Sequence, residues 1–298
     1  MTTILDTIRA ELAAGTLAPF IGPGALEGVT HADTGRVIPA TSDELILALN
    51  NGQPMAPRLM YEFPRAAMNI ELKRGRSAIN RFMQQTYGDA GWSESAVHAW
   101  LASLDLPYII DLNRDTGLQK LYANRPHTLI VGIARIAGGP RYKLFRHDGA
   151  NYGNEIDASA IDPDAPVLFK PCGTPWPEPN WIASDADFVD YITELMGGFA
   201  IPPFLKERRK GLKYLVSGAR LNRDTIRMIL ADIIYDAAQP AGWALIPNAN
   251  DKEKRFCARI GLELVDADIR DLAGLAPDRA SLTENPGSLE SPTAATTG

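Results

Sequence analysis

The stretch Ile109-Ile110-Asp111-Leu112-Asn113-Arg114-Asp115 joins a short apolar run to an Asn-x-Asp triplet. Such a run is typical of a strand covered on both faces, as in a parallel sheet. Two further buried-looking runs also end in glycine or small residues: Pro19-Phe20-Ile21-Gly22-Pro23-Gly24-Ala25 and Leu168-Phe169-Lys170-Pro171-Cys172-Gly173. Open parallel sheets bind ligands beyond the carboxyl ends of their strands, so these strand ends are candidate site segments.

Strand and helix patterns alternate in the second half of the chain, which predicts an α/β fold with a doubly wound, Rossmann-like parallel sheet. Strands are expected at residues 17–21, 108–112, 128–131, 167–169, 213–217, 243–246 and 262–265. The strand at 128–131 is expected beside the one at 108–112. Residues 142–156 have the pattern of a hairpin around Asp148-Gly149.

A helical insert is expected at about residues 41–104, because Thr41 and Glu44 form a capping box and helical spacing of apolar residues follows. Residues 1–276 are predicted to form one domain that contains this insert. Residues 277–298 are rich in Ser, Thr, Pro, Gly and Glu, and we expect them to be a disordered tail.

Composition narrows the classes of protein. The 298 residues are 45% hydrophobic and 22% charged, as in an ordinary globular protein, and the net charge of −6 argues against nucleic-acid binding. Two cysteines without a metal-binding spacing predict neither a disulfide framework nor a metal site. No apolar run approaches the roughly 20 residues of a membrane span, and no signal-peptide pattern is present, so a cytoplasmic protein without membrane contact is expected.

Each motif taken alone also has a structural interpretation. The Gly22-Pro23-Gly24 loop is either a tight turn or a cradle in which backbone amides approach a diphosphate. An Asn-x-Asp triplet is usually a turn or a helix cap. His147 is expected in a turn, His127 just before a strand, and His31 and His98 in a loop and on a helix surface.

Read together and in this order, the motifs resemble the sirtuin-like family of NAD-binding domains, in the bacterial form without a zinc ribbon. The resemblance covers roughly residues 10–272. The loop Gly22, Pro23, Gly24 and Ala25 is similar to the Gly-Ala-Gly loop of the family, with Pro23 in place of Ala and Leu26 in place of the Ser that follows. It implies that these four residues bind the dinucleotide.

The resemblance also implies a catalytic set. Asn113 would face the nicotinamide ribose and orient water, and Asp115 would hold the loop or the nicotinamide. Cys172, followed by Gly173 on the cofactor side, stands where the family has its His base. Three interpretations of Cys172 stay open: an inert buried thiol, an altered catalytic or redox group, or a ligand contact without chemistry.

The turn after residues 213–217 completes the resemblance. It is similar to the family's Gly-x-Ser-Leu-x-Asp segment, which implies that Gly218, Ala219 and Arg220 contact the ribose and phosphates. The expected function is NAD binding, with cleavage of the nicotinamide–ribose bond by a glycohydrolase. The alternatives are a catalytically silent sensor of NAD or ADP-ribose and a protein-interaction module that has lost its pocket. The sequence leaves open the protein partner and whether the chain forms a homo-oligomer.

Overall fold

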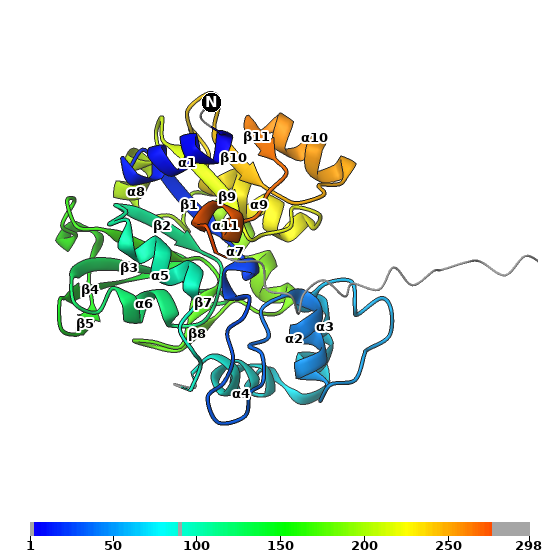
Figure 1. Ribbon diagram of the computed structural model, residues 1–298. Coiled ribbons are helices and arrows are strands. Elements are labelled where there is room, and N and C mark those ends of the chain that lie inside the picture. The colour runs from blue at the N-terminus through cyan, green and yellow to red at the C-terminus, as the bar shows by residue number, and fades with distance from the viewer. Residues whose placement is uncertain (1–2, 89–90, 276–298) are drawn as a thin grey trace, which may run out of the picture.

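One central sheet organises the computed structural model, which describes residues 3–88 and 91–275. Its strand order is β11-β10-β9-β1-β2-β6-β3-β4-β5, and all neighbours are parallel except at β3–β4 and β4–β5 (Figure 1). The strands are β1 Leu17–Ile21, β2 Tyr108–Asp111, β3 Pro126–Gly132, β4 Tyr142–Asp148, β5 Tyr152–Glu155, β6 Val167–Lys170, β9 Lys213–Ser217, β10 Gly242–Leu245 and β11 Leu262–Val265. A small second sheet pairs β7 Gly173–Thr174 with β8 Asn180–Trp181.

Helices cover both faces of this sheet. The helices of the described residues are α1 Ile4–Ala13, α2 Ser42–Leu49, α3 Phe63–Arg74, α4 Arg76–Tyr87, α5 Ala96–Ser103, α6 Gly117–Leu121, α7 Asp185–Met196, α8 Pro203–Arg208, α9 Asp224–Ile233, α10 Asp251–Arg259 and α11 Ile269–Ala273, with short 3-10 turns at Pro23–Leu26 and Ala158–Ala160. One apolar core joins the sheet to α7, α9 and α10, and a second joins it to α1, α5 and α11. The predicted doubly wound, Rossmann-like α/β fold is confirmed.

The prediction that the strand at 128–131 lies directly beside β2 is wrong. β6 lies between β2 and β3, with Leu168 paired to Ile109 on one side and to Leu129 on the other. All three strands are continuous apolar runs, so any of them suits a central position, and the hydrophobic pattern cannot rank them.

Helices α2, α3 and α4 form a group with its own core, which includes Ile46, Phe63, Ile79 and Met83. Figure 1 shows these three helices together beyond the strands of the central sheet. Helix α5, expected in the same insert, instead packs on the sheet core. The predicted tail at 277–298 lies outside the described residues. Within the described ranges, no helix has the length and apolar character needed to cross a bilayer.

Candidate functional site

The carboxyl ends of β1 and β9 meet at the point where the strand order reverses, which is the usual ligand position in a doubly wound sheet. The Gly22 amide donates to Ser217 O at 3.0 Å, and the Gly24 amide donates to Gly218 O at 2.8 Å. A Cβ on Gly22 would lie 2.5 Å from Ala219 Cβ. The two glycines therefore allow two backbone turns to touch.

The backbone amides of the 22–25 loop are all accounted for within the protein. The Ala25 amide donates to Gly22 O at 3.1 Å, and Pro23 has no N–H. The turn interpretation thus explains the loop without a ligand. Binding of a dinucleotide by Gly22, Pro23, Gly24 and Ala25 stays a prediction.

Arg220 connects the turn at 218–220, which follows β9, to helix α10. Its guanidinium donates to both carboxylate oxygens of Glu253, at 3.0 and 2.7 Å, and the Leu221 amide donates to the same side chain. Gly218 has φ +67°, a conformation that favours glycine. These contacts shape the turn at 218–220, and its predicted contact with ribose or phosphate remains a prediction.

Asn113 joins the end of β2 to the end of β1. Its Nδ2 donates to Gly22 O at 3.0 Å and to Asp111 Oδ1 at 2.9 Å, and its side chain is buried. The fold thus brings together two of the predicted site residues, which lie 91 positions apart in the chain.

A buried ion pair lies beneath Asn113. Lys170 Nζ donates to Asp111 Oδ2 at 2.7 Å and to the carbonyl oxygen of Asp115 at 3.0 Å. Asp111 and Lys170 had no role in the catalytic set expected from the sequence. The available signal was that each charged residue closes an apolar run at the end of a strand.

His98 is buried, so its expected place on a helix surface is wrong. The side chain is 0% exposed, and its ring lies between two carboxylates, with Nε2 3.9 Å from Asp111 Oδ2 and Nδ1 3.9 Å from Asp115 Oδ2. Helix α5 turns this residue toward the sheet edge together with Val97 and Leu101.

Asp115 is held ionised by its surroundings. Burial alone would raise the pKa of its carboxyl, but Lys170, His98 and a hydrogen bond from the Gly117 amide hold that pKa below its usual value.

Ligand atoms of His98, Asp111 and Asp115 lie within 4.8 Å of one another. Both Asp111 oxygens already accept hydrogen bonds, so we assign no metal to this cluster.

Cys172 lies in the apolar core beside the same sheet edge. Burial raises the pKa of its thiol, and the positive charges of Arg114 and Lys170 only oppose this effect. A thiol with a raised pKa stays protonated near neutral pH and is a poor base. Gly173 has φ +89° and pairs β7 with β8. This environment favours the inert-thiol interpretation, and the catalytic role of Cys172 stays a prediction.

A cavity of about 160 Å³ opens beside Asp115. Its apolar wall includes Leu26, Val29, Ile38, Tyr87 and Trp92, and its polar lining includes Glu94, Ser95, Thr116 and Lys120. An apolar cavity of about 150 Å³ in another protein holds one benzene ring. Whole-ligand pockets run from about 300 Å³ upward, so this cavity matches a single ring and no more.

Two other histidines, His127 and His147, lie elsewhere in the sheet. His127 is in β3, and His147 is in β4 and buried, so its expected place in a turn is wrong. Their rings stack with centroids 4.7 Å apart. His127 Nε2 lies 2.6 Å from the Tyr152 hydroxyl.

Comparison with known proteins adds no assignment: the chain matches no protein-family model and no curated protein. The sirtuin-like resemblance therefore stays a prediction based on the motifs.

Proposed function

We propose that this chain is a sirtuin-like protein that binds NAD or ADP-ribose at the carboxyl edge of its sheet and holds it without rapid cleavage. The observation that carries the proposal is the contact between Asn113 and the Gly22 carbonyl. It brings two motifs of the resemblance together at the ends of β1 and β2, next to the switch point between β1 and β9, where dinucleotides bind in doubly wound folds. The bacterial, cytoplasmic setting expected from the sequence is part of this proposal.

The cavity beside Asp115 supports the nicotinamide end of this assignment. Its apolar wall suits an aromatic ring, and an ionised Asp115 accepts hydrogen bonds from a carboxamide N–H. Within the described residues, Asp115 Oδ1 is buried and has no hydrogen-bond donor. A buried acceptor without a donor is costly, and a carboxamide would supply one.

The case against rapid cleavage is the missing base. In a hydrolase, Asn113 would orient water while nicotinamide leaves through an oxocarbenium-like state, and Cys172 would have to accept a ribose hydroxyl proton. Burial raises the pKa of this thiol, which opposes that step. A silent NAD or ADP-ribose sensor therefore fits this site better than a glycohydrolase.

Calorimetry with NAD and with ADP-ribose tests binding. We expect Asn113→Ala to weaken the binding of both ligands at least tenfold, because it removes the hydrogen bond that joins the Asn-x-Asp loop to Gly22. Asn151→Ala is the matched control, since Asn151 lies in the exposed turn between β4 and β5. If the wild-type chain binds neither nucleotide, the proposal is rejected in favour of a protein-interaction module that has lost its pocket.

Chromatographic detection of released nicotinamide tests cleavage. We expect little release from the wild-type chain, no change in Cys172→Ser and a clear rise in Cys172→His, since imidazole restores a base that titrates near neutral pH. Fast wild-type release that Cys172→Ser abolishes would instead make the thiol catalytic.

A further inference from the structure

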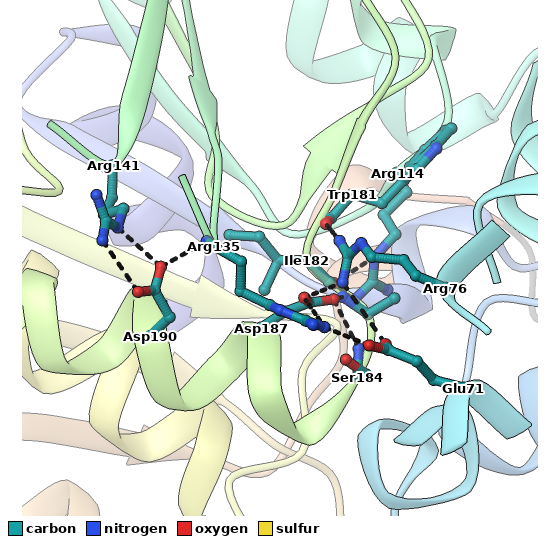
Figure 2. Close-up of polar contacts among 11 residues, drawn as sticks. Glu71, Arg76, Arg114, Arg135, Arg141, Trp181, Ile182, Ser184, Asp187 and Asp190 are labelled. Carbon is teal, nitrogen blue, oxygen red and sulfur yellow. Dashed lines mark hydrogen bonds and ion pairs between the residues drawn. The ribbon is translucent and has the colours of Figure 1, made fainter. Parts of the chain in front are cut away.

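Within the part of the chain that the structure describes, Arg114 is a buried cation without a carboxylate partner. The residue is 9% exposed, and its Nε and Nη2 donate to the carbonyl oxygen of Ile182 at 3.2 and 2.6 Å (Figure 2). Its guanidinium carbon lies 5.8 Å from the centre of the Phe63 ring. Among residues 3–88 and 91–275, no acidic side chain forms an ion pair with it.

The other buried arginines of the described chain are paired. Arg141, 7% exposed, bonds both carboxylate oxygens of Asp190, and Arg227, 8% exposed, bonds Asp224. A buried charge is costly unless a counter-charge and hydrogen bonds compensate it. One carbonyl oxygen supplies only part of that compensation, so the site of Arg114 favours an anion.

The position of Arg114 connects this charge to the candidate site. It stands between Asn113 and Asp115 in the chain, and its positive charge acts on Cys172 and on Tyr87 of the cavity wall. The glycine loop nearby has no backbone amide left for a phosphate. A guanidinium supplies a rigid fork of N–H donors suited to phosphate.

We propose that Arg114 binds the phosphate or diphosphate of the ligand, in place of the glycine-loop amides. The nucleotide identity of this ligand rests on the proposed function, but the anion site does not. Arg114 is thus a ligand-binding residue that selects for phosphorylated compounds over the corresponding nucleosides.

The test measures thermal unfolding and calorimetric binding of the full chain with pyrophosphate, ADP-ribose or adenosine, and with sodium sulfate at matched ionic strength. Arg114→Gln removes the charge, and Arg114→Lys keeps the charge but loses the fork. Arg208→Gln is the matched control, because Arg208 also donates to a backbone carbonyl, Pro107 O at 2.9 Å, immediately before β2 at the opposite edge of the sheet.

We expect pyrophosphate and ADP-ribose to stabilise the wild type more than sulfate does, with affinities that fall at least tenfold in Arg114→Gln and less in Arg114→Lys. Arg208→Gln should bind both like the wild type. The affinity for pyrophosphate should fall less steeply with added salt in Arg114→Gln than in the wild type. If that variant does not fold, the comparison between Arg114→Lys and the wild type decides.

The outcomes separate this inference from the proposed function. Pyrophosphate that fails to bind the wild type, or binds the Arg114 variants equally well, overturns the inference. Equal ADP-ribose binding by Arg114→Gln overturns it and leaves the proposed function standing. Binding of pyrophosphate that depends on Arg114, without binding of NAD or ADP-ribose, supports the anion site and rejects the proposed function.

Discussion

The Lys170 ammonium lies 2.7 Å from the Asp111 carboxylate, and each side chain is 1% exposed. The pair joins the ends of the adjacent parallel strands β6 and β2. Lys170 also donates to the Asp115 backbone, so the same ammonium fixes the loop that follows β2. The Asn-x-Asp loop therefore depends on a charge that comes from another strand.

Lys170→Met should lower the free energy of unfolding by about 3 to 5 kcal/mol, because it leaves a buried carboxylate without its partner. Urea denaturation measures the change. Lys213→Met is the control, since Lys213 pairs with Glu11 at the surface and such pairs contribute about 0 to 1 kcal/mol. A loss of unfolding free energy as small as that of the control would show that water solvates the Asp111 carboxylate once Lys170 is removed.

Gly22→Ala should destabilise the fold by about 3 kcal/mol, the upper end of the usual cost of overpacking. The new methyl group would lie 2.6 Å from the Gly218 carbonyl oxygen, which belongs to the backbone and cannot rotate away. Gly153→Ala is the control, because the nearest atom to its Cβ would be 3.9 Å away. Equal melting temperatures of the two variants would reject the close packing of the β1 and β9 turns.

Local patterns in the sequence located the strands well. The bounds predicted at 17–21, 213–217 and 262–265 coincide with those of β1, β9 and β11, because continuous apolar runs and glycine breaks act locally. The position of β6 between β2 and β3 could not be predicted in this way, since strand order depends on contacts between distant segments.

The polar contacts of the candidate site show the same division. The sequence placed Asn113 at a strand end, but its bond to Gly22 depends on the order of β1 and β2. The burial of His98 was missed because α5 is a short, largely apolar helix, whose pattern does not indicate which side faces the sheet.

Burial lowers the pKa of His127 to about 4, with a further lowering by the stacked His147, while a bond to the Arg125 carbonyl opposes the shift. Between pH 6.5 and 4 the unfolded chain therefore binds a proton at this residue that the folded chain rejects. The neutral ring therefore contributes to the free energy of unfolding above pH 6.5. This contribution, about 3 kcal/mol at most, is lost as the pH falls toward 4.

His127→Gln should flatten this part of the stability curve, because glutamine cannot be protonated there. Urea denaturation at several pH values between 4 and 7 gives both curves, and their difference isolates His127 from the carboxylates that titrate nearby. Parallel curves would contradict the shift.

Both thiols should resist modification in the folded chain. Cys172 and Cys257 are buried, and burial raises the pKa of each, that of Cys257 to about 11. Ellman's reagent should find almost no fast thiol in the native protein and two in denaturant, the number in the sequence. One fast native thiol that disappears in Cys172→Ser would revive the reactive interpretation of this residue.

Asp187 links the helical group α2–α4 to helix α7. Its buried carboxylate accepts bonds from Arg76 of α4 and from the Ala183 and Ser184 amides, and Arg135 lies 3.6 Å away (Figure 2). Asp187→Asn removes the charge that both arginines face. We expect a loss of about 1.5 to 3 kcal/mol, the usual worth of hydrogen bonds to a charged group.

Hydrogen exchange locates the effect of Asp187→Asn. Amides of α3 and α4 should exchange faster in this variant, while those of β1 change little, because the lost contact anchors the helical group rather than the sheet. Asp190→Asn is the control, since Asp190 lies one turn further along α7 and pairs with Arg141, which directly precedes β4 of the central sheet. Unchanged exchange of α3 and α4 would mean that the apolar core around Phe63 and Met83, rather than Asp187, holds the helical group in place.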